Sequence, residues 1–215
     1  MQDSQAIPEM ETNIGSIFDT RHRAKDEKRL AVLNAAAKLF LAHGFHRTRL
    51  DDIAEALGVT KPALYNYFKN KHEILFACHM LGHDMIEEEM SKIEMAKGRG
   101  LDRLKALIRA YAYIMTQKFG MCLVRLDEHE LSPKQSAEIA HCRRLVNDRF
   151  ESYLRLAIDD GSALPCNVKM TTFAITGSLN WVSRWYRSDG AMSSKEIADH
   201  FAESLTQSLS VRSVN

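Results

Sequence analysis

The stretch "TRLDDIAEALGVTKPALYNYFKNK", Thr48–Lys71, decides the fold of this 215-residue chain. Its first half predicts a short helix that Thr48 caps, with Asp51 completing a capping box three residues later. The apolar positions that share one face of that helix are Ile53, Ala54 and Leu57. Gly58 follows directly and can adopt the positive φ of a sharp turn. The pattern therefore predicts a helix that ends in a tight glycine turn.

The second half predicts another short helix that begins near Thr60 and Pro62. Leu64 and Phe68 lie at i and i+4 and share its inward face. The small residue Ala54 lets the two helices cross closely, which is typical of a helix-turn-helix. The outward face carries hydroxyl, amide and ammonium groups that can donate hydrogen bonds to phosphates and base edges. The residues expected to contact DNA are Thr48, Thr60, Lys61, Pro62, Ala63, Tyr65, Asn66, Tyr67 and Lys71.

The charge distribution supports this interpretation. Residues 21–75 hold 11 Lys/Arg and 6 Asp/Glu, a net charge of +5, whereas residues 1–20 hold four acidic and no basic side chains. A local basic excess is expected in a segment that meets a polyanion. The alternative is a surface turn with exposed tyrosines. The glycine turn, the cap and the local charge together favour double-stranded DNA as the partner.

The remaining sequence predicts helices and no strands, because it has no run of alternating β-branched residues. Residues 1–22 are polar and aperiodic and are predicted to be a disordered extension. Helices are expected near residues 26–43, 71–96, 101–118, 133–160, 167–186 and 193–209, with 121–131 short or irregular. The predicted fold is all-α, with a helix-turn-helix domain over 23–70 and a larger helical domain over 71–215.

Several other features of the sequence narrow the classes of function that we expect. The sequence has no apolar run that could span a bilayer and no secretory signal, so we expect a cytoplasmic protein without a membrane partner. The four cysteines are scattered, which is typical of an intracellular protein whose cysteines stay reduced. His79 and His83 could supply two metal ligands but have no matched third, so we expect no metal. No catalytic or cofactor motif stands out, so we expect neither an enzyme nor a cofactor. A redox role for Cys142 stays open.

Residues 29–75 resemble the DNA-binding domain of TetR-family transcriptional repressors. The matching residues are Gly44-Phe45, Thr48, Ile53-Ala54, Leu57-Gly58-Val59, Leu64–Lys71 and Ile74-Leu75. Pro62 stands where the family often has glycine, and Tyr67 where it often has histidine, which changes a donor on the phosphate side. The resemblance implies a three-helix DNA-binding domain, a fourth helix that links it to a ligand-binding and dimerisation domain, and a homodimer. Such a dimer binds a palindromic operator and releases it when a small molecule binds.

The segment "GSLNWVSRWY", Gly177–Tyr186, is similar to one in TetR-like regulators that respond to acyl-coenzyme A thioesters. Such an effector needs an apolar channel for its acyl group and arginines for its phosphates. The residues expected to bind it are Met115, Phe119, Arg125, His129, Arg144, Phe150, Asn180, Trp181, Arg184 and Trp185. Ordinary core packing is the alternative for the methionine and phenylalanine positions. A different hydrophobic effector, as in regulators of efflux or other catabolic operons, and a DNA-binding protein without an effector remain open.

The last two predicted helices are the family's usual dimer interface. One carries small and aromatic residues at Phe173, Ala174, Gly177, Ser178 and Trp181. The other has an apolar stripe at Ile197, Phe201, Leu205 and Leu209. Packing of these stripes within one protomer is the alternative.

Overall fold

The computed structural model describes residues 9–210; residues 1–8 and 211–215 lie outside the described part. The described residues form helices without a β-strand, which confirms the all-α prediction. None of these helices is long and apolar enough to cross a membrane. In order they are α1 Glu9–His43, α2 Leu50–Leu57, α3 Lys61–Tyr65, α4 Lys71–Met95, α5 Gly100–Met115, α6 Lys118–Arg125, the 3-10 helix η1 Glu128–Glu130, α7 Pro133–Asp159, α8 Val168–Trp185 and α9 Ser194–Gln207.

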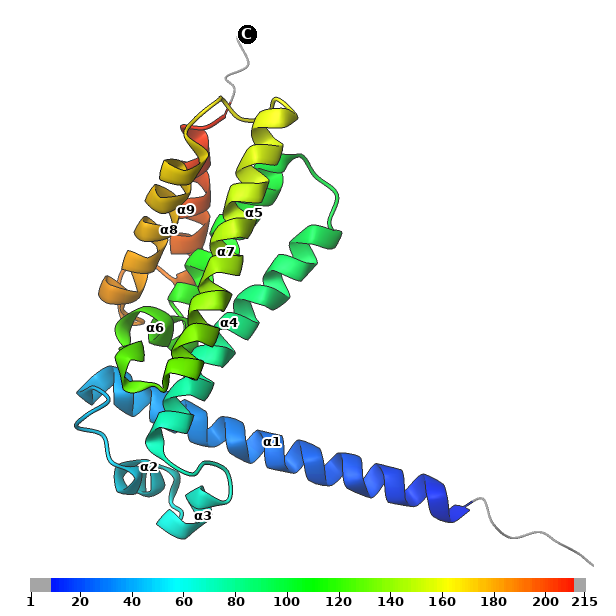
Figure 1. Cartoon of the computed structure of the whole chain (residues 1–215), viewed down its shortest axis with the longest axis vertical. Helices are drawn as coiled ribbons and strands as arrows, with labels where there is room; N and C mark the ends of the chain where they lie inside the picture. Colours follow the sequence, from blue (N-terminus) through cyan, green and yellow to red (C-terminus); the bar gives the residue numbers. More distant parts are fainter. Residues whose placement is uncertain (1–8, 211–215) are drawn as a thin grey trace, which may run out of the picture.

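The N-terminal unit, here called the head, consists of α1, α2, α3 and the first turns of α4 and lies at one end of the molecule (Figure 1). Its core includes Ile53, Leu64 and Phe68, which the sequence predicts to face inward, together with Phe40 of α1. Phe45 folds back after the turn at Gly44 and packs edge-on against Phe40, with 5.3 Å between the ring centroids. An apolar cluster therefore lies beneath the helix-turn-helix.

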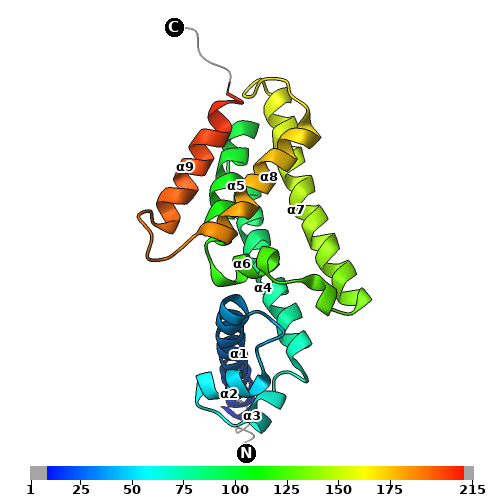
Figure 2. The same ribbon diagram turned by 90° about the vertical axis from the view of Figure 1, so that its left-hand side faces the viewer.

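The body comprises α5 to α9 with the outer part of α4, and α5 lies at its centre, between α4, α7, α8 and α9 (Figure 2). The side chains of α5 that face these neighbours are buried, including Leu104, Ile108 and Met115. Gly100, where α5 begins, lies against the backbone of α7; a Cβ built there would be 2.1 Å from the amide nitrogen of Ala157. The close contact explains why a glycine occupies that position.

The start of the first helix differs from the expectation. Residues 1–8 of the predicted irregular extension lie outside the described residues, whereas from Glu9 the chain is already helical and continues to His43. Between Pro8 and Gly44 the sequence has no proline, and Gly15 is its only glycine, so it contains no strong helix breaker. The expected boundary between residues 22 and 23 therefore falls inside a helix, and the division into domains stays a prediction.

Helix α6 joins the two units. Cys122 of α6 and Leu126, the residue that follows the helix, belong to the same apolar cluster as the core of the head. The guanidinium of Arg125 donates a hydrogen bond to the carbonyl of Leu41, near the end of α1, at 3.0 Å. In the loop before α2, His46 faces Glu130 of η1, with 3.0 Å between the imidazole and the carboxylate. The head is thus held by α6 and η1 as well as by α4.

Candidate nucleic-acid interface and interior cavity

The turn between α2 and α3 has the geometry that the sequence predicts. Gly58 has a φ of 64°, in the left-handed region, and closes α2. The amide of Gly58 donates to the carbonyl of Glu55, and that of Val59 to the carbonyl of Ala54, both at 3.0 Å. Ala54 and Ile53 are buried beneath the turn. These bonds fix the angle at which α3 is presented.

The cap of α2 lies one residue later than predicted. Arg49 occupies the N-cap position, and its amide donates to the carboxylate of Asp52 at 2.7 Å, so Asp51 takes no part in the box. Thr48 is buried, and its hydroxyl donates to the carbonyl of Gly44 at 2.9 Å. The structure therefore places Thr48 under the surface, where it fixes the preceding turn.

The exposed face of the helix-turn-helix is formed by α3 and its approaches. Thr60 occupies the N-cap position of α3 without a side-chain cap bond, and Lys61 forms an exposed ion pair with Asp51 at 3.0 Å. Tyr65 is half exposed, and Asn66 is exposed beside it. Of the other predicted contacts, Pro62 is exposed, whereas Ala63 and Tyr67 are partly buried. These groups form a polar, partly aromatic surface of the kind that contacts DNA.

Lys71 has a different environment from the one expected. Its ammonium donates to the carbonyl of Phe45 at 3.1 Å and to those of His46 and Thr48 at 3.4 Å. It also lies 4.3 Å from the centroid of the Phe45 ring. The side chain therefore holds the loop between α1 and α2 in place.

Sequence reasoning missed two exposed arginines, Arg47 and Arg49, just before α2. Neither forms an ion pair with a described residue, unlike Lys61. They flank Thr48, whose side chain points inward, so both arginine side chains point outward to the surface. The local basic excess was the signal that could have identified them.

The body contains an interior cavity of about 300 Å³ between α4, α5, α6, α7 and α8. Its apolar walls include Ile86, Leu123, Val124 and Val146. Its polar lining consists of His83, Tyr111, Arg143, Asn147, Thr176 and Asn180. Phe173 and Gly177 complete the lining and are also exposed on α8, so the cavity opens on that side. A concave, mainly apolar space with a few polar groups is typical of a small-molecule site.

Most polar groups of this cavity are already paired. The Tyr111 hydroxyl donates to Asn180 at 2.8 Å, and burial raises the pKa of this phenol well above its ordinary value. Arg143, at the rim on α7, forms an ion pair with Glu128. Burial lowers the pKa of His83 to about 4, with a further lowering by the nearby positive charge of Arg143. The imidazole is therefore neutral at neutral pH.

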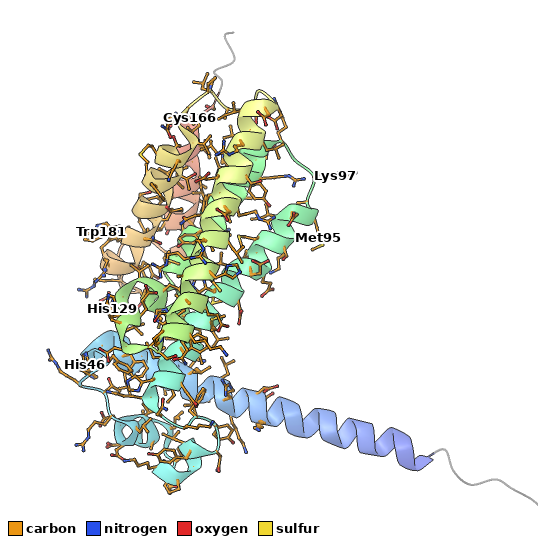
Figure 3. All side chains as sticks on the ribbon, in the orientation of Figure 1. His46, Met95, Lys97, His129, Cys166 and Trp181 are labelled. Carbon is orange, nitrogen blue, oxygen red and sulfur yellow. The ribbon has the colours of Figure 1, made fainter. Side chains whose placement is uncertain are left out.

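Of the ten predicted effector-binding residues, the structure places Asn180 alone in the lining of this cavity. Met115 and Phe150 are fully buried core residues, and Phe119 packs against the cluster of the head. Arg125 contacts the end of α1 instead, while Arg184 donates to the carbonyl of Val124 and so braces α6. His129, Arg144, Trp181 and Trp185 are exposed. Figure 3 shows Trp181 and His129 on the outside of the body.

Arg143 and His83 are the residues that sequence reasoning passed over. The dipeptide Arg143–Arg144 offered two candidates, and neighbouring residues of a helix point about 100° apart. The cavity is lined by the first of the two, and the second faces solvent. Among the described residues no group of three or more His, Cys, Asp or Glu side chains could hold a metal ion.

A second hollow of about 520 Å³ lies between α4, α5 and α9. Its apolar floor includes Ala106 and Ala110, whose small side chains leave the space. Several charged groups at its rim are paired: Arg109 binds Asp199 at 2.6 Å, and Glu88 and Glu89 bind Lys92. It is larger than the interior cavity, but only α4, α5 and α9 line it. The interior cavity also contacts α6, which reaches the head, and is therefore the better candidate site.

The outer face of α8 is apolar. Met170, Phe173, Trp181 and Trp185 are 55%, 49%, 65% and 45% exposed, so this face is uncovered in the protomer. The stripe on α9 differs, because Ile197 and Leu209 are buried in the core of their own protomer and Phe201 and Leu205 are partly buried.

Comparisons with known proteins agree with this arrangement. Residues 97–209 match the tetracyclin repressor-like C-terminal domain, and residues 32–78 match the bacterial regulatory proteins of the tetR family. The transcriptional activator FasR of Mycolicibacterium smegmatis is 28% identical over 116 residues, which is 54% of this chain and about half of FasR, at 53%. The transcriptional repressor KstR2 of Mycobacterium tuberculosis is 22% identical over 179 residues, 82% of this chain and 90% of KstR2.

The same architecture occurs in solved structures. AibR, solved in complex with isovaleryl coenzyme A and operator DNA, is 26% identical with a TM-score of 0.72, and the match covers 82% of this chain and 96% of AibR. The matches to the two family models agree with the exposed helix-turn-helix and with the body that contains the cavity. The chain belongs to the tetR family of bacterial regulatory proteins.

Proposed function

We propose that this protein is a transcriptional repressor that binds a palindromic operator as a homodimer and releases it when an acyl-coenzyme A thioester enters the interior cavity. The observation that carries the proposal is the course of α4. Its first turns, with Ile74 and Leu75, are buried in the core of the head, and its later turns, with His83 and Ile86, line the cavity. One rigid helix therefore contacts both the DNA-binding unit and the ligand space.

The DNA contacts are proposed for the exposed face described above. Tyr65, Asn66 and the N-terminus of α3 face outward and would enter the major groove, while Arg47 and Arg49 would contact phosphates. Two such heads must be about 34 Å apart to meet successive major grooves. A ligand that tilts α4 in each protomer changes that spacing and prevents simultaneous docking.

The homodimer is proposed from the outer face of α8. A second copy would cover Met170, Phe173 and Trp181, which a protomer alone leaves in water. Gly177 lies on the same face in the middle of the helix, and a Cβ built there meets nothing within 4 Å. Glycine lowers helix stability by about 1 kcal/mol relative to alanine. Close approach of a partner helix at Gly177 explains its presence where the protomer's own packing does not.

The effector class is proposed from the chemistry of the cavity. Its walls suit an acyl chain, and the exposed Arg143 at its rim suits an anionic group such as the phosphates of coenzyme A. AibR, which binds isovaleryl coenzyme A, has the same fold and 26% identity over most of both chains. The role first expected of Arg184 passes to Arg143, because Arg143 lines the cavity, whereas Arg184 does not and binds the carbonyl of Val124 instead.

The test begins with selection of a duplex that the purified protein retains, followed by fluorescence anisotropy of the labelled duplex. Acyl-coenzyme A should release the DNA, and the matching free acid should do so far less. Arg143→Met should weaken the thioester about ten- to a hundredfold, the value of a lost charge-assisted hydrogen bond. Arg144→Met is the matched control, because its side chain faces solvent on the same helix.

The outcomes separate the alternatives. Release by free acids or by hydrophobic cations, but not by thioesters, would replace the acyl-coenzyme A assignment with a regulator of an efflux or another catabolic operon. Release by no ligand would favour a DNA-binding protein without an effector. Failure to retain any duplex at low salt would contradict the DNA-binding role of the exposed face.

A further inference from the structure

Two histidines on α4, His79 and His83, are polar groups that the fold leaves unsatisfied. His79 is 1% exposed, and neither of its ring nitrogens has a hydrogen-bond partner among the described residues. The Nδ1 atom of His83 is also buried and has no partner in the described part of the chain. The two residues are one helical turn apart, and the ring of His83 lines the interior cavity.

Such an arrangement costs stability. A buried polar atom without a partner loses its hydrogen bond to water and gains nothing in return. A leucine or phenylalanine would fill the same space without that loss. Packing within the protomer therefore gives no reason for imidazoles at these positions. Buried polar groups without partners are found mainly at functional sites.

Four other polar groups of the cavity, on α5, α7 and α8, have partners. Thr176 donates to the carbonyl of Thr172 at 3.0 Å, and Tyr111 donates to Asn180. Arg143 has its ion pair with Glu128 at the rim. His83 is thus the cavity-lining group on α4 whose hydrogen-bonding capacity remains available to a ligand.

We propose that the effector places a neutral carbonyl group against the His83 ring and that His83 is the residue through which α4 recognises the acyl group. A neutral imidazole has one N–H donor, which a carbonyl oxygen can accept. Burial lowers the pKa of both histidines to about 4, so the rings carry no charge that would favour a carboxylate. The polar groups of the cavity then orient the ligand. The anionic part of the ligand faces Arg143 at the rim, and the carbonyl of the ligand faces α4.

This inference rests on the proposed function, since it assumes that the cavity takes an acyl thioester. It adds a specificity-determining contact, because a ligand that lacks the carbonyl leaves the imidazole unpaired. The contact lies on the helix that continues into the head, so the energy of recognition acts on α4 itself.

The experiment compares two ligands that differ in one group. Hexanoyl-coenzyme A has the thioester carbonyl, and S-hexyl-coenzyme A has a methylene group in its place. Isothermal titration of the wild-type protein should show about tenfold tighter binding of the thioester, the usual worth of one hydrogen bond. In His83→Phe that preference should disappear, because the variant can donate to neither ligand. The two ligands and two proteins form a double-mutant cycle that isolates the contact.

Controls keep the test decisive. His141→Phe, an exposed position on α7, should retain the full preference. Circular dichroism and operator affinity report whether each variant is folded, and His83→Met serves as a second variant if His83→Phe is not. Equal binding of the two ligands by the wild type, or an unchanged preference in a folded His83 variant, would overturn the inference.

The two proposals fail in different ways. If hexanoyl-coenzyme A binds and releases the operator while His83 has no influence, the proposed function stands and this contact is refuted. If no acyl-coenzyme A binds at all, the proposed function is refuted and the contact with it.

Discussion

Replacing His79 by leucine tests whether this buried imidazole lowers the stability of the folded protein, and lowers it further at acidic pH. Burial lowers the pKa of His79 from 6.5 to about 4, with a smaller lowering by the neighbouring His83. Glu128 acts in the opposite direction and Arg143 in the same direction. The folded state therefore binds the proton more weakly than the unfolded chain, so folding stability falls as pH drops from about 6.5 towards 4. At about 1.4 kcal/mol per pKa unit, a shift of this size corresponds to about 3 kcal/mol.

The assay is urea denaturation followed by circular dichroism at several pH values from 7.5 to 4.5. We expect the wild type to lose stability over this range and His79→Leu to lose about 2–3 kcal/mol less. At pH 7.5 the variant should also be more stable by about 1 kcal/mol, because the unpaired nitrogens are gone. His141→Leu, at an exposed position on α7, should follow the wild type. Parallel curves for the wild type and His79→Leu would refute this account of the buried imidazole.

Three further changes test other contacts. Gly82→Ala should destabilise the protein by about 1–3 kcal/mol, because the added Cβ would be 2.6 Å from the backbone carbonyl oxygen of Phe119. The amides of α4 and α6 should then exchange faster with solvent deuterium. Unchanged protection of both helices would contradict this. Trp181→Glu should convert the dimer to a monomer in sedimentation experiments, since it places a charge on the apolar face of α8; a dimer of wild-type affinity would refute that interface. Arg49→Ala should reduce the salt slope of operator binding by about one unit, whereas Lys71→Met should lower stability and leave the slope unchanged.

The sequence predicted the helices and the helix-turn-helix well because these depend on local patterns. Gly58 is required by the left-handed turn that it forms, and the inward spacing of Leu64 and Phe68 holds in the structure. The cap of α2 was displaced by one residue. A capping pattern favours Thr48, but Thr48 is buried and its hydroxyl donates to the carbonyl of Gly44, so Arg49 occupies the N-cap position. A choice of that kind depends on tertiary packing, which a capping pattern does not contain.

The cavity could be predicted far less well, because its lining comes from five helices whose rotation about their own axes the sequence does not determine. On α8 both Asn180 and Trp181 were predicted to bind the effector, yet Asn180 lines the cavity and Trp181, the next residue, faces outward. On α7 the same difference of one residue separates Arg143 from Arg144. Large or charged side chains indicate an important face, but they do not indicate whether a ligand or a second protomer covers it.

Helix α6 gives the cavity a second connection to the head that the sequence did not suggest. Leu123 and Val124 line the cavity, Arg125 binds the end of α1, and Leu126 is buried in the cluster of the head. Four consecutive residues therefore reach from the ligand space to the DNA-binding unit. Because Gly82 brings α4 against the backbone of α6, neither helix can shift far without the other. Under the proposed function, a ligand that displaced either wall of the cavity would act on the head at two places, through the start of α4 and through the end of α1.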